Sequence, residues 1–309
     1  MSIATTPLFH RLLERSPFSE HELVVLIATA PSRYKTHYID KRGGRGRREI
    51  SQPTKEIKFL QRILIRHELR DLAVHDAVAG YRRGLSILDH AQPHASARYL
   101  LKLDFADFFP SLKRGALDYR LSQDTQYSLV ERWILCNLLC RRKGTTATYQ
   151  LSIGAPSSPL VSNYLMYEFD DRITDFCNTK AVRYTRYADD LAFSTSQPSV
   201  LDDVESEVCR LIQELKYLGL SLNDAKTTNV STKRRRTLVG LTLSNDGHAS
   251  IGRAAKRELR QAIYRVSRSL LSPPETANLR GRLAFTYAID PDFVTQLLSR
   301  YGYESIADI

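Results

Sequence analysis

The chain has 309 residues, of which 42% are hydrophobic, so it can bury real cores in one large domain or in two to three lobes. Lys and Arg outnumber Asp and Glu by 45 to 34, and the resulting charge of +11 favours a polyanionic partner such as nucleic acid or an anionic membrane. Residues 23–30 are too short to span a bilayer, and residues 1–14 lack the order of a signal peptide. We therefore predict a cytoplasmic protein with no membrane partner.

The four cysteines and eight histidines do not show the spacing of a zinc site. Cys136 and Cys140 lie in one apolar helical run, which indicates burial rather than a ligand role. We expect all of the thiols to be reduced, as is usual in the cytosol.

Periodic apolar residues predict the order of helices and strands along the chain. Apolar residues recur every three or four positions in residues 55–72, 126–140 and 199–220, which indicates amphipathic helices. The last of these helices has Ser199 as its predicted N-cap and Gly219 as its stop. The other predicted elements are, in order, a strand at 99–109, a helix at 157–176, two strands within 181–195 and a strand at 236–244.

From residue 99 onward the predicted order is strand, helix, strand, strand, helix, strand, which is that of a ferredoxin-like (βαββαβ) domain. In this arrangement the first strand and the central hairpin can be neighbours in the sheet. Asp104 lies in the first strand, and Asp189 and Asp190 lie at the tip of the hairpin in "RYTRYADDLAFST". The predicted fold therefore brings these carboxylates together although they are distant in sequence.

The charge of Asp104 is flanked by leucines and phenylalanines, an unfavourable place for an unpaired carboxylate. Converging carboxylates repel one another unless a cation neutralises them, and hard oxygen ligands suit Mg²⁺. Two such ions would stabilise the attacking and leaving oxygens of a phosphoryl displacement, which predicts nucleotidyl transfer. Asp-Asp pairs also occur at 170–171 and 202–203, so for Asp189-Asp190 alone a plain surface turn is an open alternative.

Four motifs resemble those of reverse transcriptases and stand in the order of that family: "LDFADFFPS" around Asp104, "GAPSSP", "YADD" and "GLSLNDAKT". The resemblance covers most of the chain and implies an α+β right-hand polymerase with fingers, a ferredoxin-like (βαββαβ) palm and a small helical thumb. It implies an RNA-directed DNA polymerase that uses two Mg²⁺ ions and deoxynucleoside triphosphates. The implied lobes are 1–98 (N-terminal helices and fingers), 99–115 (palm, first part), 116–150 (fingers helices), 151–243 (palm, second part) and 244–309 (thumb).

The resemblance also implies roles for single residues. Asp104, Asp189 and Asp190 are the implied metal ligands and catalytic residues, and Lys226 is the implied proton donor to the leaving pyrophosphate. Phe109 matches the aromatic ring that excludes a ribose 2′-OH, with an ordinary core aromatic as the alternative.

A basic hairpin at residues 35–53 carries glycines between two strand-like arms. In the family such a fingers hairpin holds the triphosphate, and the matching residues are Lys41 and Arg48, with the neighbouring arginines as alternatives. Ile153 departs from the Gln that the family commonly has before the next Gly, which implies the loss of a contact to the incoming nucleotide. The implied nucleotide-binding residues are Lys41, Arg48, Phe105, Phe109, Gly154, Ala155 and Pro156.

Residues 253–271 predict one helix with two faces. The apolar face is formed by Leu259, Ile263, Val266 and Leu270. The basic face is formed by Arg253, Arg257, Arg260, Tyr264 and Arg268. A basic stripe that carries an aromatic side chain is typical of a surface that binds a nucleic-acid backbone, and a solvated face is the alternative.

Little sequence follows the implied thumb, which implies a compact bacterial type of reverse transcriptase. Among these the chain most resembles a retron reverse transcriptase, because it carries two elements similar to those of retrons. "HAQPH", which contains His94, resembles a retron element between fingers and palm, and "LVG", which contains Gly240, resembles an element after the palm. Both residues are therefore implied to contact nucleic acid. The alternatives are a surface histidine and a strand glycine.

Retron enzymes copy part of a cognate structured non-coding RNA into multicopy single-stranded DNA (msDNA), primed from an RNA 2′-OH. They act in antiphage defence, and the implied partners are this RNA, its RNA–DNA product and an effector protein encoded nearby. One alternative is another compact bacterial reverse transcriptase, of the diversity-generating or stand-alone defence type. The other is a catalytically silent RNA-binding module that controls an effector.

Overall fold

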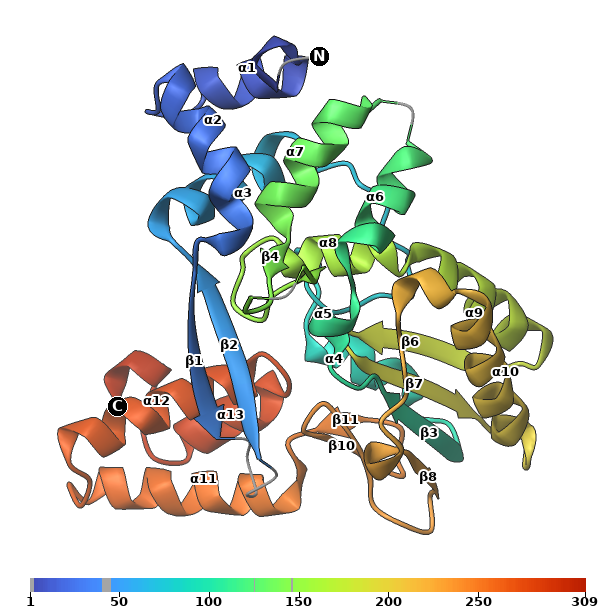
Figure 1. Ribbon diagram of the computed structural model, residues 1–309. Helices are drawn as coiled ribbons and strands as arrows, with labels where there is room; N and C mark the ends of the chain where they lie inside the picture. The colour runs from blue at the N-terminus through green and yellow to red at the C-terminus, as the bar shows by residue number, and fades with distance from the viewer. Residues whose placement is uncertain (1–2, 41–45, 125, 146) are drawn as a thin grey trace.

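The computed structural model describes residues 3–40, 46–124, 126–145 and 147–309 (Figure 1). Lys41, one of the predicted nucleotide-binding residues, lies outside these described residues. Within them, every helix is too short or too polar to cross a lipid bilayer.

A lobe of helices forms the upper part of the molecule in Figure 1. Its helices are α1 (Pro7–Glu14), α2 (Glu20–Thr29), α3 (Lys55–His67), α6 (Arg114–Ser122) and α7 (Leu129–Leu139). They share one apolar core, to which Leu12, Leu60 and Leu135 belong. Both α2 and α7 begin with a capping box, in which a Ser and a Glu exchange hydrogen bonds. The helices predicted at 55–72 and 126–140 are confirmed, although each is shorter than predicted.

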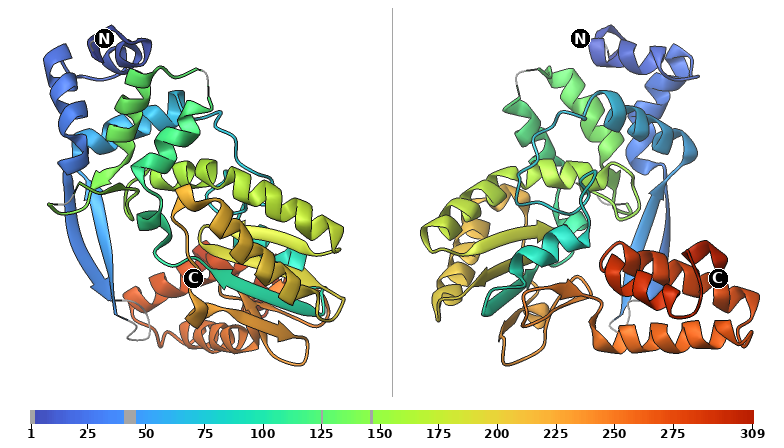
Figure 2. Two further views of the ribbon diagram at one scale, coloured as in Figure 1. Left: turned by 45° about the vertical axis from the view of Figure 1, so that its right-hand side comes forward. Right: turned by 180° about the vertical axis from the view of Figure 1, so that it is seen from behind.

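A two-stranded antiparallel ribbon is formed by β1 (Tyr34–Asp40) and β2 (Arg47–Pro53), which confirms the predicted hairpin. The ribbon leaves the helical lobe and extends toward the C-terminal helices (Figures 1 and 2). Ser51 and Pro53 are buried near its base, whereas most of its other side chains, including Arg48, are exposed.

The central sheet has the strand order β6-β7-β3-β8, and all of its pairs are antiparallel. Its strands are β3 (Tyr99–Asp104), β6 (Arg183–Tyr187), β7 (Asp190–Thr195) and β8 (Thr228–Ser231). The helices that connect them are α8 (Ser158–Leu165), α9 (Tyr167–Thr179) and α10 (Val200–Glu214). Helices α9 and α10 pack side by side on one face of the sheet (Figure 1). This is the ferredoxin-like order, so the predicted fold class is confirmed.

The fourth strand of this sheet differs from the prediction. Residues 236–244 do not join the central sheet, because Val239 and Gly240 adopt φ values of 44° and 86° and fold the run back on itself as a hairpin. The central sheet instead takes β8 as its fourth strand. The separate small sheet contains β9 (Arg236–Leu238), β10 (Leu241–Leu243) and β11 (Ala249–Ser250).

Two helix predictions also need correction. The helix predicted at 157–176 is divided at Met166, where a ψ of −3° ends α8 before α9 begins. Ser199 precedes α10 as predicted, but its φ is 65° and its side chain makes no capping hydrogen bond. Gly219 does end this region, with a φ of 68° after a 3₁₀ turn.

Short segments cover the other face of the central sheet. Helix α4 (Ile87–Ala91) and the 3₁₀ turn Gln92–His94 lie against this face. Ala91, Leu100 and Leu238 belong to a second core, which joins the central sheet to the small sheet. The remaining short elements are α5 (Phe108–Ser111), β4 (Arg141–Arg142) and β5 (Tyr149–Gln150).

The C-terminal lobe packs three helices around a core of its own. The helices are α11 (Gly252–Ser267), α12 (Pro273–Tyr287) and α13 (Pro291–Ser299). Leu259 and Ile263 are buried in this core, as predicted. The expectation that Leu270 extends the apolar stripe is wrong, because α11 ends before it and its side chain is 58% exposed.

Candidate active site in the central sheet

The hairpin between β6 and β7 carries two of the predicted carboxylates at its tip. Tyr187 pairs with Asp190, so Ala188 and Asp189 form a two-residue turn in which Ala188 has a φ of 58°. Asp104, the last residue of β3, pairs directly with Asp190. The backbone N–H that follows Asp104 donates to the Asp189 carbonyl oxygen over 3.1 Å. The register of the sheet therefore brings these three carboxylates to one place.

Lys226 joins this cluster from the 3₁₀ turn Asp224–Lys226. Its Nζ donates to both carboxylate oxygens of Asp104, at 2.8 and 2.7 Å. The Asn223 N–H donates to the Asp104 carbonyl oxygen over 2.8 Å, which fixes the turn against β3. Because Asp104 is only 5% exposed, the ammonium group of Lys226 supplies charge that the buried carboxylate requires.

The carboxylates on the turn are not fully neutralised by the protein. Burial and then the negative charges of Asp189 and Asp104 raise the pKa of Asp190 to about 6. Burial, followed by the charge of Asp104, also raises the pKa of Asp189. In the part of the chain that the structure describes, no group of three carboxylates, imidazoles or thiolates has the spacing of a ready metal site. The excess negative charge nevertheless suits a place that receives a hard cation on oxygen ligands.

A cavity of about 1080 Å³ opens beside these residues. It lies between the β1–β2 ribbon, the end of β3 and the Asp224–Lys226 turn. Asp104 and Asp189 line it, whereas Asp190 does not. The other predicted residues that line it are Lys226, Arg48, Phe105, Phe109 and Ile153. A polyanion that enters this cavity would meet both carboxylates and basic side chains.

The "GAP" loop stands behind one wall of the cavity rather than in it. The Ser51 N–H donates to the Ile153 carbonyl oxygen over 2.8 Å, which ties the loop to β2. Gly154 has a φ of 111°, and a Cβ there would approach the Ser51 carbonyl oxygen to 3.2 Å. Ala155 is buried, and neither it nor Pro156 lines the cavity. In this structure the loop supports the ribbon, and Ile153 is its residue in the cavity.

Residues 39–243 match the reverse transcriptase (RNA-dependent DNA polymerase) family. The chain is 35% identical over 292 residues to the retron Ec83 reverse transcriptase of Escherichia coli, with 92% of both chains covered. It is 29% identical to the retron Ec86 reverse transcriptase of Escherichia coli, with 95% of this chain and 90% of the relative covered. The chain belongs to the retron reverse transcriptases. It is therefore an RNA-directed DNA polymerase, as the motifs predicted.

Solved structures agree with this retron reverse transcriptase in fold. The apo telomerase of Candida tropicalis matches with a TM-score of 0.50 at 14% identity, over 86% of this chain. The chain spans 58% of the length of that telomerase chain. At this identity the likeness shows a shared fold only.

His94 is not a surface residue in this retron reverse transcriptase. Its ring is completely buried between the 3₁₀ turn and the sheet, where Nδ1 lies 2.7 Å from Ser194 Oγ and Nε2 lies 2.7 Å from Thr185 Oγ1. Burial lowers the pKa of His94 to about 3, so the ring is neutral. The alternative, a surface histidine, is therefore wrong. The contact of His94 with nucleic acid stays a prediction, and in this structure the ring has no exposed surface that could make it. Gly240, by contrast, is exposed in the hairpin turn between β9 and β10.

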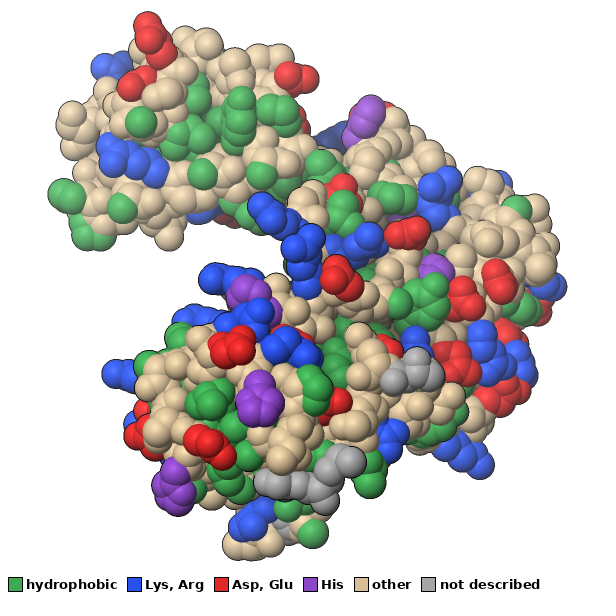
Figure 3. Space-filling model, turned by 90° about the horizontal axis from the view of Figure 1, so that it is seen from above, with side chains coloured by type: hydrophobic (Ala, Val, Ile, Leu, Met, Phe, Trp, Pro, Cys, Tyr) green, Lys and Arg blue, Asp and Glu red, His purple; other side chains and the backbone are tan. Residues whose placement is uncertain are grey.

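The basic stripe of the C-terminal lobe is exposed, as a binding face requires. Arg253, Arg257, Arg260 and Tyr264 lie on α11, and Arg268 follows the end of this helix. The Arg260 guanidinium lies 5.1 Å from the centre of the Phe293 ring, and that of Arg268 lies 5.8 Å from the centre of the Tyr264 ring. Figure 3 shows a hollow between the C-terminal lobe and the rest of the molecule, with Lys and Arg side chains gathered mainly on the side opposite this lobe.

Tyr81 also lines the cavity of about 1080 Å³, and no sequence pattern predicted it. Its ring lies 6.2 Å from that of Phe109 and 6.1 Å from that of Tyr187, between centroids. Its φ of 62° is unusual for a non-glycine residue and is invisible in a sequence. Two nearby glycines, Gly80 and Gly84, were the available signal that the backbone approaches another segment here.

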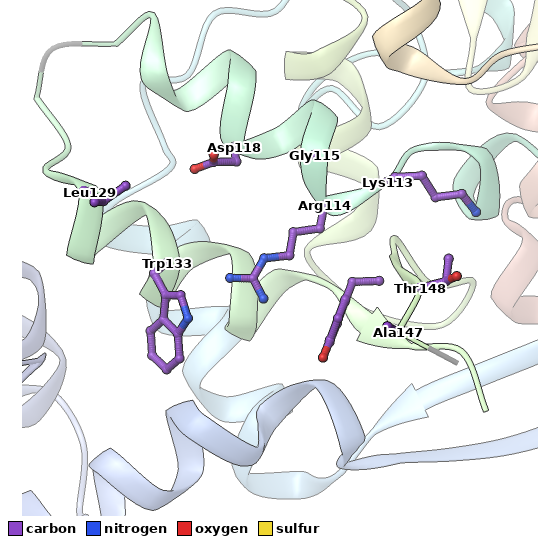
Figure 4. A pocket seen from close by; sticks show the side chains of 9 residues that line it. Lys113, Arg114, Gly115, Asp118, Leu129, Trp133, Ala147 and Thr148 are labelled. Atoms are coloured by element: carbon purple, nitrogen blue, oxygen red, sulfur yellow. The ribbon is translucent and has the colours of Figure 1, made fainter. Parts of the chain in front are cut away.

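A second cavity, of about 660 Å³, lies in the helical lobe (Figure 4). Arg114 and Trp133 line it, and the Arg114 guanidinium lies 5.4 Å from the centre of the Tyr149 ring. Asp118 is the one carboxylate among its described lining residues. Its described lining residues therefore lack the paired carboxylates of the cavity of about 1080 Å³.

Proposed function

We propose that this retron reverse transcriptase copies part of a cognate structured non-coding RNA into msDNA, primed from an RNA 2′-OH. We propose further that it acts in antiphage defence together with an effector protein encoded nearby. The observation that carries the proposal is the cluster of Asp104, Asp189, Asp190 and Lys226, all of which except Asp190 line one cavity, in a chain of this family. A catalytically silent RNA-binding module would not need this arrangement.

Asp104, Asp189 and Asp190 are the residues that would hold Mg²⁺ on their carboxylate oxygens. Burial, and then the negative charge of the neighbouring carboxylates, raises the pKa values of Asp189 and Asp190. Bound there, two metal ions would stabilise the attacking and leaving oxygens of nucleotidyl transfer. Lys226 holds a proton on Nζ at the edge of the same cluster, where it can pass that proton to the leaving pyrophosphate.

The incoming deoxynucleotide would occupy the cavity between the ribbon and the palm. Arg48, with Lys41 as its proposed partner, would bind the triphosphate from the ribbon, because a guanidinium holds phosphate oxygens bidentately. Phe109 and Phe105 line the same cavity. Phe109 is the proposed obstacle to a ribose 2′-OH. Gly154, Ala155 and Pro156 would act indirectly, through the ribbon that they support.

The template–product duplex would lie in the hollow that Figure 3 shows between the C-terminal lobe and the rest of the molecule. The basic stripe of α11 is its proposed contact in the C-terminal lobe. The exposed turn at Gly240 is the second proposed contact to the RNA. We propose the lobe boundaries predicted from the sequence, with the palm at residues 99–115 and 151–243 and the thumb at 244–309.

Expression from the native locus tests this proposal, with analysis of the nucleic acid that co-purifies with the protein. A discrete DNA joined to RNA by a 2′,5′ branch is expected from the parent, and none from Asp189→Asn. Primer extension on an added RNA template, without any branched DNA from the locus, would overturn the retron reaction and leave another kind of reverse transcriptase. Phage challenge of cells that carry the locus, with and without the neighbouring gene, tests the effector.

A further inference from the structure

We propose that Arg186 and Asp170 form a buried ion pair that positions the catalytic turn for DNA synthesis. Both side chains are fully buried, and neither lines the catalytic cavity. They are positioning residues, because they act through the turn at Ala188 and Asp189. The inference deepens the proposed function, since it assumes that this turn is the catalytic one.

The pair is bidentate and is completed by a tyrosine. Arg186 Nε donates to Asp170 Oδ1 over 2.8 Å, and Nη2 donates to Oδ2 over 2.6 Å. The Tyr184 hydroxyl donates to Asp170 Oδ1 over 2.7 Å. These hydrogen bonds hold the guanidinium plane in one orientation, since a fork against a carboxylate allows little rotation.

The remaining terminal nitrogen of Arg186 is directed at the catalytic turn. Nη1 donates to the Ala188 carbonyl oxygen over 3.0 Å and to Asn163 Oδ1 over 3.2 Å. Asn163 Nδ2 in turn donates to the Gly80 carbonyl oxygen over 2.9 Å. The guanidinium therefore connects α9, α8 and the segment before the palm to the backbone of the turn.

The backbone around the pair shows why the turn needs this support. Ala188 adopts a φ of 58°, which is unfavourable for a residue with a Cβ and persists only where the surroundings hold it. The Arg186 N–H donates to the Ala77 carbonyl oxygen, and its own carbonyl oxygen accepts from the Ala79 N–H, both over 2.9 Å. Residue 186 is thus fixed on both sides, and its side chain transmits that fixed position to Ala188.

Fold stability alone does not explain an ion pair at this place. Burying two charges has a large desolvation cost, and well-packed apolar side chains often match or exceed the stability of a buried pair. Apolar side chains would not donate to the Ala188 carbonyl oxygen. The ion pair provides what apolar side chains cannot, which is an oriented N–H donor to the backbone of the proposed metal-binding turn.

Two variants separate positioning from stability, with primer extension on an added RNA template as the activity. Arg186→Lys keeps a charge against Asp170 but loses the bidentate fork and the directed Nη1 donor. A triple variant, Asp170→Leu with Tyr184→Phe and Arg186→Met, replaces the network by apolar groups. Arg183→Lys, at an exposed position of the same strand, is the matched control. Circular dichroism and melting temperature report folding for each protein.

For both variants we expect kcat to fall by about 100-fold, the scale of a displacement near 1 Å, with KM for template–primer unchanged. The Mg²⁺ concentration for half-maximal activity should rise severalfold, which a loss of folded protein alone would not cause. A folded variant with the parental kcat and Mg²⁺ midpoint overturns the proposal. So does a loss of activity that only matches the loss of folded protein. Primer extension on an added RNA template needs no branched product. The assay therefore tests the role of Arg186 and Asp170 even if the proposed retron reaction proves wrong.

Discussion

Gly80→Ala should displace the catalytic turn, because Gly80 lies directly against it. A Cβ at this position would be 2.7 Å from the Ala188 nitrogen and 3.1 Å from the Tyr187 Cα. Ordinary contacts begin at 3.4 Å, so the two backbones must separate by about 0.7 Å. Neither atom belongs to a flexible side chain that can move aside. The segment around Gly80 and the turn that carries Asp189 and Asp190 must therefore move apart, and we expect the turn to be displaced.

The expected cost is large in rate and moderate in stability. A displacement near 1 Å in an active site can lower the rate by about 100-fold, which is about 2.7 kcal/mol of transition-state stabilisation. Overpacking typically lowers the free energy of unfolding by about 1–3 kcal/mol. The variant should therefore stay folded at 25 °C while it loses most of its activity.

Single-nucleotide incorporation on an RNA template measures the rate, and denaturant unfolding measures the stability. Gly281→Ala is the matched control, because this glycine lies in α12 and a Cβ there would meet nothing within 4 Å. The control should gain about 0.5–1 kcal/mol of stability and keep the parental rate. A folded Gly80→Ala protein that works at the parental rate would refute the reasoning about the turn.

Three further predictions concern other residues of the cavity and the basic stripe of α11. Phe109→Ala should increase ribonucleotide incorporation relative to deoxynucleotide incorporation, and unchanged discrimination would place the gate elsewhere. Lys226→Ala should lower the maximal rate of single-nucleotide incorporation by about 100-fold at saturating substrate, and a parental rate would exclude the proton-donor role. Arg257→Ala with Arg260→Ala should weaken RNA binding and lower its salt slope by about one per lost phosphate contact. An unaltered slope would assign this face to solvent.

The carboxylate cluster was predictable because strand order and sequence period determine it. The βαββαβ pattern placed Asp104 beside the hairpin tip, and the register Asp104 to Asp190 shows this neighbourhood directly. The fourth strand was not predictable in the same way, because the run at 236–244 has strand character and joins a different sheet. Which sheet a strand joins depends on tertiary contacts that a local pattern does not contain.

Buried polar residues were the least predictable part of the site. His94 and Arg186 read as surface residues by type, yet both are completely buried and hydrogen-bonded. Asp170 belongs to one of the other Asp-Asp pairs, whose presence weakens the evidence from any such pair alone. The structure shows that Asp170 forms an ion pair with Arg186 of β6. The position of the Tyr81 side chain depends on a positive φ at this residue. Such partners are created by the fold and have no periodic signal in the sequence.

One measurement tests the central claim most directly: extension of a primer on an RNA template in Mg²⁺ by the parent, Asp189→Asn and Asp202→Asn. Asp202→Asn is the matched control, because it makes the same chemical change in another Asp-Asp pair, in the first turn of α10. The account predicts extension by the parent and by Asp202→Asn, and none by Asp189→Asn, with RNA binding retained in all three. Extension by Asp189→Asn at near the parental rate would contradict the assignment of the catalytic centre.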